Sequence, residues 1–338
     1  MKTMHLVERV LLMGLIFMLF SSVTGAENYC QKGLFENSYV KEIKVFSDTC
    51  DILMAGYHEG IFVGIVADDI WEHRNSGLNK LSVNCVLINP DNNDQIFVGT
   101  CWSGIYVSND RGFTWEASSA GLKHLDVVAL ECDPETPGTL FAGTLGGGVY
   151  RSTDSGKSWS NCSNGLKEFD IGAILVAPWY SKFIYAASFQ GSLYFSGNGV
   201  ENWQFLSSFS EVGHFATAIK ASKNDPYSIY VATYGDGVKF SSDGGRHWRN
   251  CNNGMDDYFV WDLEIHPSDP NLIFAGTKNE GVFVSIDGGM EWHPFFKKYS
   301  PNTAFEVILD RRRPQRFYVS DFCGNFLITE DPNWECDR

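Results

Sequence analysis

SNDRGFTW, the stretch from Ser108 to Trp115, decides the fold, because the same pattern recurs three more times along the chain. Segments 152–159 (STDSGKSW), 241–248 (SSDGGRHW) and 285–292 (SIDGGMEW) keep serine, aspartate, glycine and tryptophan at identical offsets. Segment 196–203 (SGNGVENW) is a degraded copy, with Asn198 and Val200 in place of the aspartate and the second glycine. The complete copies comprise Ser108, Asp110, Gly112, Trp115, Ser152, Asp154, Gly156, Trp159, Ser241, Asp243, Gly245, Trp248, Ser285, Asp287, Gly289 and Trp292. Self-similarity at a fixed period is the sequence signature of a repeat protein.

Tryptophans mark the period of this repeat. Trp71, Trp115, Trp159, Trp203, Trp248, Trp292 and Trp334 are separated by 44, 44, 44, 45, 44 and 42 residues. Seven of the ten tryptophans in the 338-residue chain therefore belong to one series, which we call the tryptophan series. A period of this length is typical of propeller blades.

The repeated residues are expected to build turns. Serine and aspartate side chains can bond nearby backbone N–H groups and so hold a turn. Glycine adopts a backbone conformation that other residues avoid, and tryptophan packs the turn against a sheet. The alternative is that the aspartates are catalytic or bind calcium. It fits less well, because a unique site is not expected in every repeat.

Each repeat also has the pattern of four short strands. In the third repeat we expect strands a to d at residues 126–132, 139–143, 149–153 and 158–162, joined by tight turns. Strand a recurs seven times, near Ile43, Val86, Val128, Ile174, Ile219, Leu263 and Val307. The sequence therefore predicts an all-β fold, a seven-bladed β-propeller of four-stranded antiparallel blades.

Residues 1–26 are expected to be a signal peptide. Lys2 and Arg9 flank a short charged region, and the apolar run 10–20 (VLLMGLIFMLF) is too short for a membrane-spanning helix. Small residues up to Ala26 suit cleavage there, while a retained N-terminal anchor is the alternative. We expect an exported protein, periplasmic or secreted, in which residues 27–338 form a single domain that does not span a membrane.

The two ends of the chain are expected to close the ring together. Residues 30–34 (CQKGL) resemble 162–166 (CSNGL) and 251–255 (CNNGM), which end strand d, so residues 27–37 are predicted to add the outer strand of the last blade. Trp334-Glu335-Cys336 reaches the same strand from the other side. A Cys30–Cys336 disulfide is therefore predicted, since export permits disulfides. Two unrelated thiols remain the alternative, because pairing cannot be read from sequence.

Composition and charge exclude several classes of protein. The chain is 44% hydrophobic and 20% charged, as in globular proteins, and carries a net charge of −15. A nucleic-acid-binding protein would need a basic surface instead. No CxxC pair or Cys/His cluster has zinc-ligand spacing, so we expect neither a metal site nor a cofactor. We expect a monomer.

Acidic residues gather on one predicted face. The b–c turns and d–a loops of a propeller share a face, which we call the loop face, and the c–d turns lie on the opposite side. Asp236, Asp256, Asp257 and Glu280 fall in loop-face segments of the fifth and sixth repeats. Two carboxylates about 5–10 Å apart would suit glycoside hydrolysis. The alternative, solvated acids in an acidic chain, is favoured, so no catalytic residue is assigned.

Aromatic and histidine side chains fall on the same face. Tyr234, Tyr258 and Trp261 lie beside these acids, and Trp102 is a further loop-face tryptophan outside the tryptophan series. Such aromatics are binding anchors or fill the core between blades. The loop-face histidines are His58, His124 and His214. They could bind a metal across the ring, but their spacing is set by the fold rather than by a motif.

The eight-residue elements from Ser108, Ser152, Ser241 and Ser285 resemble the Asp-box, or BNR repeat, of sialidases, sortilin-type receptors, xyloglucan glycosidases and photosystem II assembly factors. The sialidase family has six blades and an Arg-Ile-Pro motif that this chain lacks. The glycosidases pair two propellers, and the sortilin-type ring is larger. In organisation the chain is most similar to the exported photosystem II stability and assembly factors. That resemblance implies a non-catalytic scaffold that binds a protein or glycan partner on its loop face. The alternative is a glycoside hydrolase that uses loop-face carboxylates.

Overall fold

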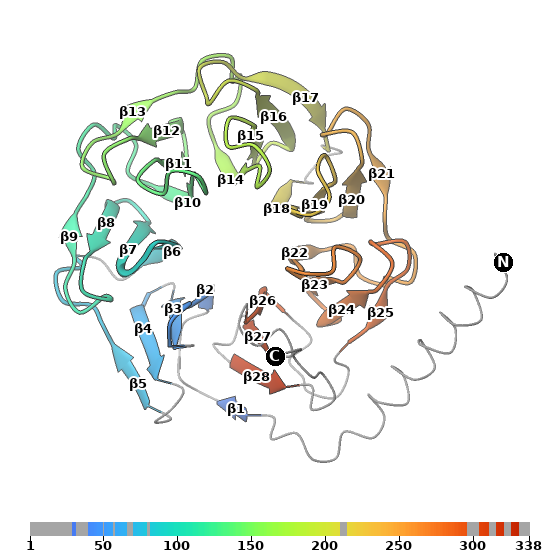
Figure 1. Cartoon of the computed structure of the whole chain (residues 1–338), viewed down its shortest axis with the longest axis horizontal. Coiled ribbons are helices and arrows are strands. Elements are labelled where there is room, and N and C mark those ends of the chain that lie inside the picture. The colour runs from blue at the N-terminus through green and yellow to red at the C-terminus, as the bar shows by residue number, and fades with distance from the viewer. Residues whose placement is uncertain are drawn as a thin grey trace, which may run out of the picture.

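Four-stranded antiparallel sheets stand around a central axis as the blades of a propeller (Figure 1). The computed structural model describes residues 29–31, 40–49, 51–56, 58–65, 70–79, 82–209, 215–295, 304–310, 316–320 and 326–330. For 29–31 and 326–330 it describes the backbone alone. The predicted signal peptide, His214 and Cys336 lie outside the described residues, as does the Cys30 side chain.

Six blades each consist of four consecutive strands. The first three are β2–β5 (Val40–Val45, Ile52–Gly56, Gly60–Ile65, Ile70–His73), β6–β9 (Val83–Asn89, Asn92–Thr100, Gly104–Ser108, Glu116–Ala117) and β10–β13 (Val127–Cys132, Leu140–Thr144, Gly148–Ser152, Ser160–Asn161). The next three are β14–β17 (Ile171–Val176, Ile184–Ser188, Ser192–Ser196, Gln204–Ser208), β18–β21 (Ala216–Ala221, Ile229–Thr233, Gly237–Ser241, Arg249–Asn250) and β22–β25 (Val260–Ile265, Ile273–Thr277, Val282–Ser285, His293–Pro294).

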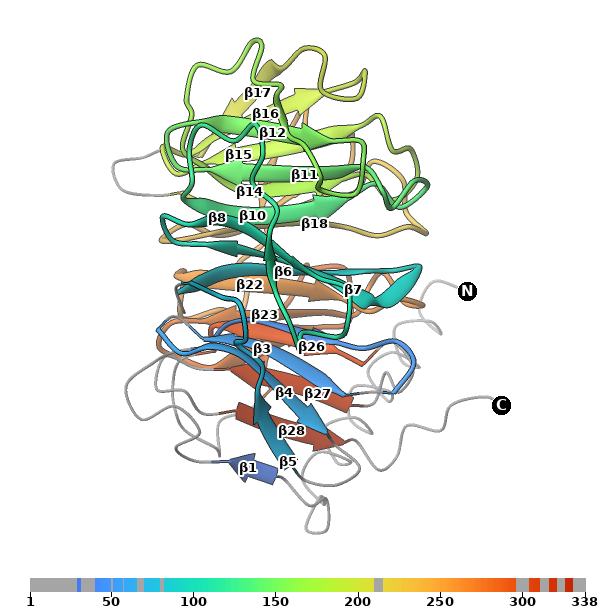
Figure 2. The same ribbon diagram turned by 90° about the vertical axis from the view of Figure 1, so that its left-hand side faces the viewer.

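A further sheet, which we call the closing sheet, differs from these six blades. Its order is β1-β28-β27-β26, so β26 (Glu306–Leu309), β27 (Arg316–Ser320) and β28 (Phe326–Glu330) pair with β1 (Tyr29–Gln31) from the other end of the chain. Tyr29 lies opposite Ile328 in antiparallel register, and Figure 2 shows β1 beside β28. The prediction of a seven-bladed propeller is thus corrected to six blades of one repeat each and a closing sheet made from both ends of the chain. The reason is that the described part of the last repeat supplies three strands, and the fourth strand of its sheet comes from the other end of the chain.

The innermost strands form the wall of the ring. Each of β2, β6, β10, β14, β18 and β22 contacts the innermost strand of the next sheet, and β26 contacts both β22 and β2. The second strand is buried along its whole length in five blades (β3, β11, β15, β19 and β23), because neighbouring blades cover both of its faces. The hydrophobic core is therefore a series of apolar layers between blades.

The four S-x-D-x-G-x-x-W segments form turns with the same hydrogen bonds. In the second blade the Ser108 hydroxyl donates to Asp110 at 2.7 Å, and Ser108 Oγ accepts the Gly112 N–H at 2.7 Å. Asp110 Oδ1 also accepts the Thr114 N–H at 2.8 Å. The copies that begin at Ser152, Ser241 and Ser285 repeat all three bonds. The bonds stay within eight residues, so the sequence pattern alone specifies the turn.

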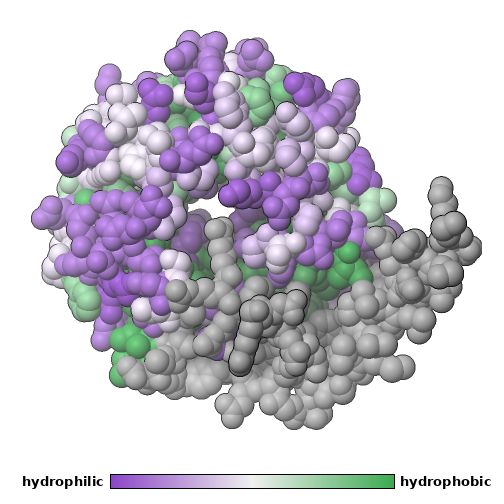
Figure 3. Space-filling view, viewed as in Figure 1, coloured by the Kyte–Doolittle hydropathy of each residue, from purple (hydrophilic) through white to green (hydrophobic). Residues whose placement is uncertain are grey.

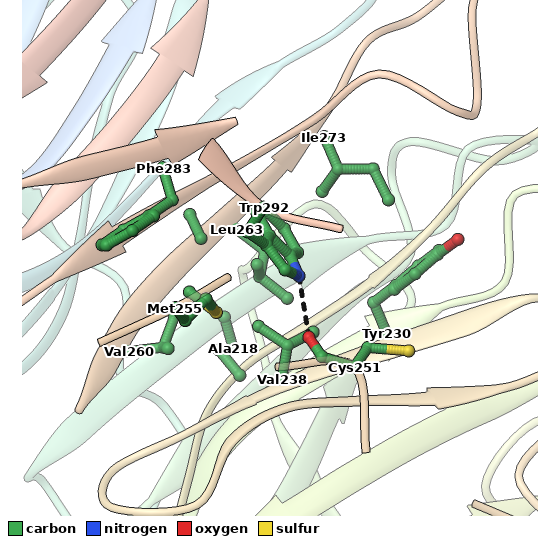
Figure 4. Packing of buried hydrophobic residues seen from close by; sticks show 12 residues of the cluster. Ala218, Tyr230, Val238, Cys251, Met255, Val260, Leu263, Ile273, Phe283 and Trp292 are labelled. Carbon is green, nitrogen blue, oxygen red and sulfur yellow. Dashed lines mark hydrogen bonds between the residues drawn. The ribbon is translucent and has the colours of Figure 1, made fainter. Parts of the chain in front are cut away.

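Tryptophans of these turns connect neighbouring blades. Trp292 donates its Nε1–H to the carbonyl of Cys251 in the preceding blade at 2.7 Å (Figure 4). Trp115, Trp159 and Trp203 make the same bond to Arg74, Ser118 and Cys162, at 2.8, 2.7 and 2.7 Å. Trp248 differs, because its Nε1–H donates to Gly245 within its own turn at 2.9 Å. We call the four bonds between blades the tryptophan links.

The face opposite the loop face is hydrophilic. Figure 3 views this side, where the β6–β7 hairpin carries the exposed residues Asp91, Asn92 and Asp94, and hydrophilic residues prevail among those described. Among the described residues, no helix is long and apolar enough to cross a membrane.

Candidate functional site

One repeated hydrogen bond holds the b–c turns of the loop face. The threonine that ends strand b donates its hydroxyl to the carbonyl of a glycine four residues later, at or just before strand c. The distances are 2.7 Å for Thr100–Gly104, 3.0 Å for Thr144–Gly148, 2.7 Å for Thr233–Gly237 and 2.9 Å for Thr277–Gly281. These turns thus present the residues between threonine and glycine in a fixed conformation.

Five aromatic side chains meet on the loop face where the fifth blade, the sixth blade and the closing sheet adjoin. Phe215 stacks on Tyr234 with ring centroids 5.2 Å apart, and Phe259 meets Tyr234 edge-on at 4.8 Å. Trp261 lies 4.9 Å from Tyr234 and 5.2 Å from Phe305. We call these five residues the aromatic cluster. Such ring pairs stabilise one another beyond the area that they bury.

The aromatic cluster carries positive charge. The Lys278 ammonium donates to the Tyr234 hydroxyl at 2.7 Å and lies 5.1 and 5.3 Å from the ring centroids of Tyr234 and Phe259. At the other end, the Lys41 ammonium lies 5.5 Å from the Phe305 ring. Burial lowers the pKa of Lys41, although nearby anionic groups partly offset this effect. The cluster is therefore an apolar surface with a cation at each end.

Two of the four candidate acids have structural partners. Asp257 is buried, and its two oxygens accept the backbone N–H groups of Phe259 at 3.0 Å and Asn279 at 2.6 Å. Asp257 thereby fixes the d–a loop to the b–c turn that holds Lys278. Asp236 forms an ion pair with Lys239. Asp256 and Glu280 are exposed on these same loops.

The remaining predicted aromatics are exposed. Tyr258 is 47% exposed, and its carbonyl accepts the N–H groups of Gly235 and Gly237 at 3.0 and 2.9 Å. Trp102 is 69% exposed, more than any other large hydrophobic residue described. The structure brings Tyr234 and Trp261 together in the aromatic cluster, whereas Trp102 is on the second blade.

The predicted histidines are spread over separate blades. His58 is exposed in the first blade, with Nδ1 3.2 Å from the Ser82 hydroxyl. His124 is exposed beside the b–c turn of the third blade, where it lies against Gly146 and Gly147. Among the described residues, no group of histidine, cysteine, aspartate and glutamate side chains could hold a metal ion.

Sequence reasoning missed three members of the aromatic cluster, Phe215, Phe259 and Phe305. Phe215, Phe259 and Phe305 each directly precede strand a, and Trp261 is the second residue of its strand a. An alignment of the repeats on strand a would have shown aromatic residues at both positions. The tryptophan series aligns the opposite face and therefore does not reveal these positions.

Sequence reasoning also missed a set of charged contacts along the innermost strands. Glu42 accepts the Val86 N–H of the next blade at 2.6 Å, and Asp262 accepts the Val307 N–H of the closing sheet at 3.3 Å. Glu306 accepts the Ile43 N–H in the same way. We call these three bonds the carboxylate links.

Two lysines balance these carboxylates. Lys44 pairs with Glu42 and lies 3.9 Å from Glu306, while Lys220 lies 3.5 Å from Asp262. Burial alone would lower the pKa of Lys44, but the adjacent carboxylates outweigh it and hold this pKa above its ordinary value. Burial raises the pKa of the Glu306 carboxyl well above its usual range. The charge states of Lys44, Glu306 and their neighbouring carboxylates therefore depend on one another.

Comparisons with known proteins support the fold and go no further. No protein-family model and no curated protein sequence matches the chain. Among solved structures, a GH74 xyloglucanase from Xanthomonas campestris matches with a TM-score of 0.75 and 14% identity, over 92% of this chain and 55% of the xyloglucanase. The chain spans about half the length of the GH74 enzymes that it matches.

Two other propeller structures match as well. A structure described as YCF48 bound to D1 peptide has a TM-score of 0.71 and 14% identity, and the match covers 93% of this chain and 99% of YCF48. The extracellular domain of the putative hybrid two-component system BT4673 from B. thetaiotaomicron has a TM-score of 0.70 and 16% identity, over 90% of this chain and 40% of that domain. At such identities the likeness shows the β-propeller fold alone.

Proposed function

We propose that this protein is an exported, monomeric propeller that binds a polypeptide partner on its loop face and does not catalyse a reaction. The observation that carries the proposal is the aromatic cluster with Lys278 at its edge. Phe259 is 36% exposed, and Phe189, which lies 5.5 Å from Phe215, is 39% exposed. Partly exposed aromatics beside a cation are typical of protein-binding surfaces.

The orientation of the rings favours a polypeptide over a glycan. A sugar ring packs with its flat side against one exposed aromatic face. In the aromatic cluster, Trp261 is inclined by 52° to Tyr234 and by 37° to Phe305, and Phe259 meets Tyr234 at 64°. Inclined rings form an uneven apolar surface, which suits inserted side chains. The bonds of Asp257 support a binding role too, since a catalytic carboxylate would need its oxygens available to a substrate.

Binding can be tested with a display library of random peptides and an array of oligosaccharides, both applied to the purified protein. We expect peptides to be enriched, and Phe259→Ala to weaken their binding by at least about tenfold, as at other interface aromatics. Phe113→Ala is the matched control, because Phe113 is 56% exposed on a turn of the opposite face. Enrichment of oligosaccharides alone, or equal losses in both variants, would contradict the proposal.

A glycoside hydrolase remains the second candidate, because Asp256 and Glu280 are exposed on adjoining loops and a xyloglucanase shares the fold. Hydrolysis of any glycan by the purified protein, abolished by Asp256→Asn or Glu280→Gln, would favour this candidate. Phe259→Ala would then lower turnover as well, through lost binding. No turnover on a broad glycan panel would leave the binding proposal in place.

A further inference from the structure

Trp102 adopts a backbone conformation that tryptophan avoids. Its φ is +68°, in the left-handed region, where the side chain of a bulky residue is strained. The same position of the b–c turn is occupied by Gly146 in the third blade and Gly235 in the fifth, with φ of +81° and +112°. The turn itself therefore suits glycine, and the second blade has a tryptophan in its place.

No described contact of the Trp102 side chain offsets this strain. Within the described residues, the Trp102 indole has no hydrogen bond, ring contact or cation contact. Tyr227 offers a comparison, because it also has a positive φ, +72°, but its ring packs against Trp179 with centroids 6.1 Å apart. Trp102 thus combines a strained backbone with a side chain that is 69% exposed. This combination is unfavourable unless something else covers the indole.

The surroundings of Trp102 indicate what would cover it. The Gly104 N–H donates to the Leu125 carbonyl at 2.8 Å, so the d–a loop with Leu125 adjoins the turn with Trp102. Leu125 is 41% exposed, and the exposed residues Lys123 and His124 precede it. We call Trp102, Lys123, His124 and Leu125 the Trp102 patch. It combines two exposed apolar side chains with a cation, although the whole chain carries a net charge of −15.

We propose that Trp102 is an anchor for the polypeptide partner, and that the partner presents an apolar side chain next to an acidic one. The apolar side chain packs on the indole and Leu125, and the acidic side chain pairs with Lys123. This inference rests on the proposed function and adds to it the chemistry of the partner. The local strain is retained because it holds the indole out from the turn.

Peptides selected from a random display library on the wild-type protein provide the test. We expect the selected peptides to share an aromatic or aliphatic residue beside Asp or Glu. Trp102→Gly should weaken their binding by at least about tenfold, since tryptophans dominate interface energies. It should also raise the thermal midpoint by roughly a few degrees, because glycine relieves the strain. Tyr227→Gly tests the same backbone change on the opposite face and should leave binding unchanged.

The outcomes separate this inference from the proposed function. Peptides that bind Trp102→Gly as well as they bind the wild type, yet lose affinity for Phe259→Ala, would overturn the anchor and leave the proposed function standing. Selected peptides without acidic residues would overturn the stated partner chemistry. A selection that enriches no peptide at all would overturn the proposed function itself. A lower thermal midpoint for Trp102→Gly would contradict the strain argument.

Discussion

Replacement of Trp292 by phenylalanine tests whether the tryptophan links hold neighbouring blades together. The Trp292 side chain is 1% exposed, and its Nε1–H donates across the blade boundary to the Cys251 carbonyl at 2.7 Å (Figure 4). Phenylalanine keeps most of the apolar contact but has no donor. The variant therefore removes one hydrogen bond and part of one ring from a closed apolar layer between the fifth and sixth blades.

The expected loss of stability follows from these two changes. A buried carbonyl left without its donor costs about 1–3 kcal/mol. The smaller ring adds roughly 1 kcal/mol through the cavity that it leaves. We expect Trp292→Phe to lower the free energy of unfolding by about 3 kcal/mol. A typical domain has about 5–15 kcal/mol, so the variant remains folded.

Trp248→Phe is the matched control, because Trp248 has the same place in its turn but donates to Gly245 of that turn. This side chain is only partly buried, so water can replace the lost donor, and we expect a loss of about 1 kcal/mol. Urea unfolding followed by circular dichroism measures both values. Equal losses in the two variants would refute the reasoning, since the blade-to-blade bond would then contribute nothing of its own.

Three further predictions concern the ring wall and the turns. Lys44→Met should lower the free energy of unfolding in urea by about 3 kcal/mol. This is the low end of the cost of a broken buried ion pair, because Lys44 is partly exposed. Adding Glu306→Gln to Lys44→Met should restore part of the lost stability. Hydrogen bonds from the Ser158 hydroxyl and N–H lower the pKa of Asp154 to about 2, so its stabilising effect should be complete above about pH 4 and be lost as the pH falls through 2. As the pH falls through this range, the thermal midpoint should fall by less in Asp154→Asn than in the wild type. Gly121→Ala should destabilise more than Gly199→Ala in the same urea assay, because an added Cβ would lie 2.1 Å from the Trp159 carbonyl oxygen but meet nothing within 4 Å at Gly199. The Gly199 variant should cost about 1 kcal/mol, for the positive φ alone.

Local features of this fold could be predicted from the sequence because their causes are local. The turn that starts at Ser152 depends on bonds among residues no more than six positions apart. The strands expected in the third repeat lie within two residues of the strands observed. Repetition of the pattern then predicts the arrangement of blades. A blade whose second strand is buried on both faces requires a similar blade on either side.

The count of blades and the make-up of the site depend on contacts that no local pattern specifies. The closing sheet combines residues that are almost 300 positions apart, as Tyr29 and Ile328 show. The aromatic cluster likewise joins Phe215 to Phe305 through Tyr234 and Trp261, which come from neighbouring blades. Asp257 looked like a candidate acid in the sequence, but its partners include Asn279 from another loop, so its role depends on tertiary structure.

The two kinds of link lie mostly in different parts of the ring, although the first and second blades are joined by both. In the described residues, tryptophan links join the first four blades in sequence and join the sixth blade to the fifth. Carboxylate links join the sixth blade to the closing sheet, the closing sheet to the first blade, and the first blade to the second. At the residue equivalent to Glu42, the third, fourth and fifth blades have Ala129, Ala173 and Ala218.

This division has a physical reason and a consequence. The closing sheet combines both ends of the chain, and within the described residues no tryptophan link joins it to a neighbouring blade. A carboxylate reaches the inner N–H of the next strand directly, but it must be balanced by Lys44 or Lys220. The strength of the neutral tryptophan links does not depend on pH, whereas the strength of the charged carboxylate links does. The junction where the chain ends meet should therefore respond to pH, because Glu306, whose pKa burial raises well above its usual range, accepts the Ile43 N–H there and lies beside Lys44.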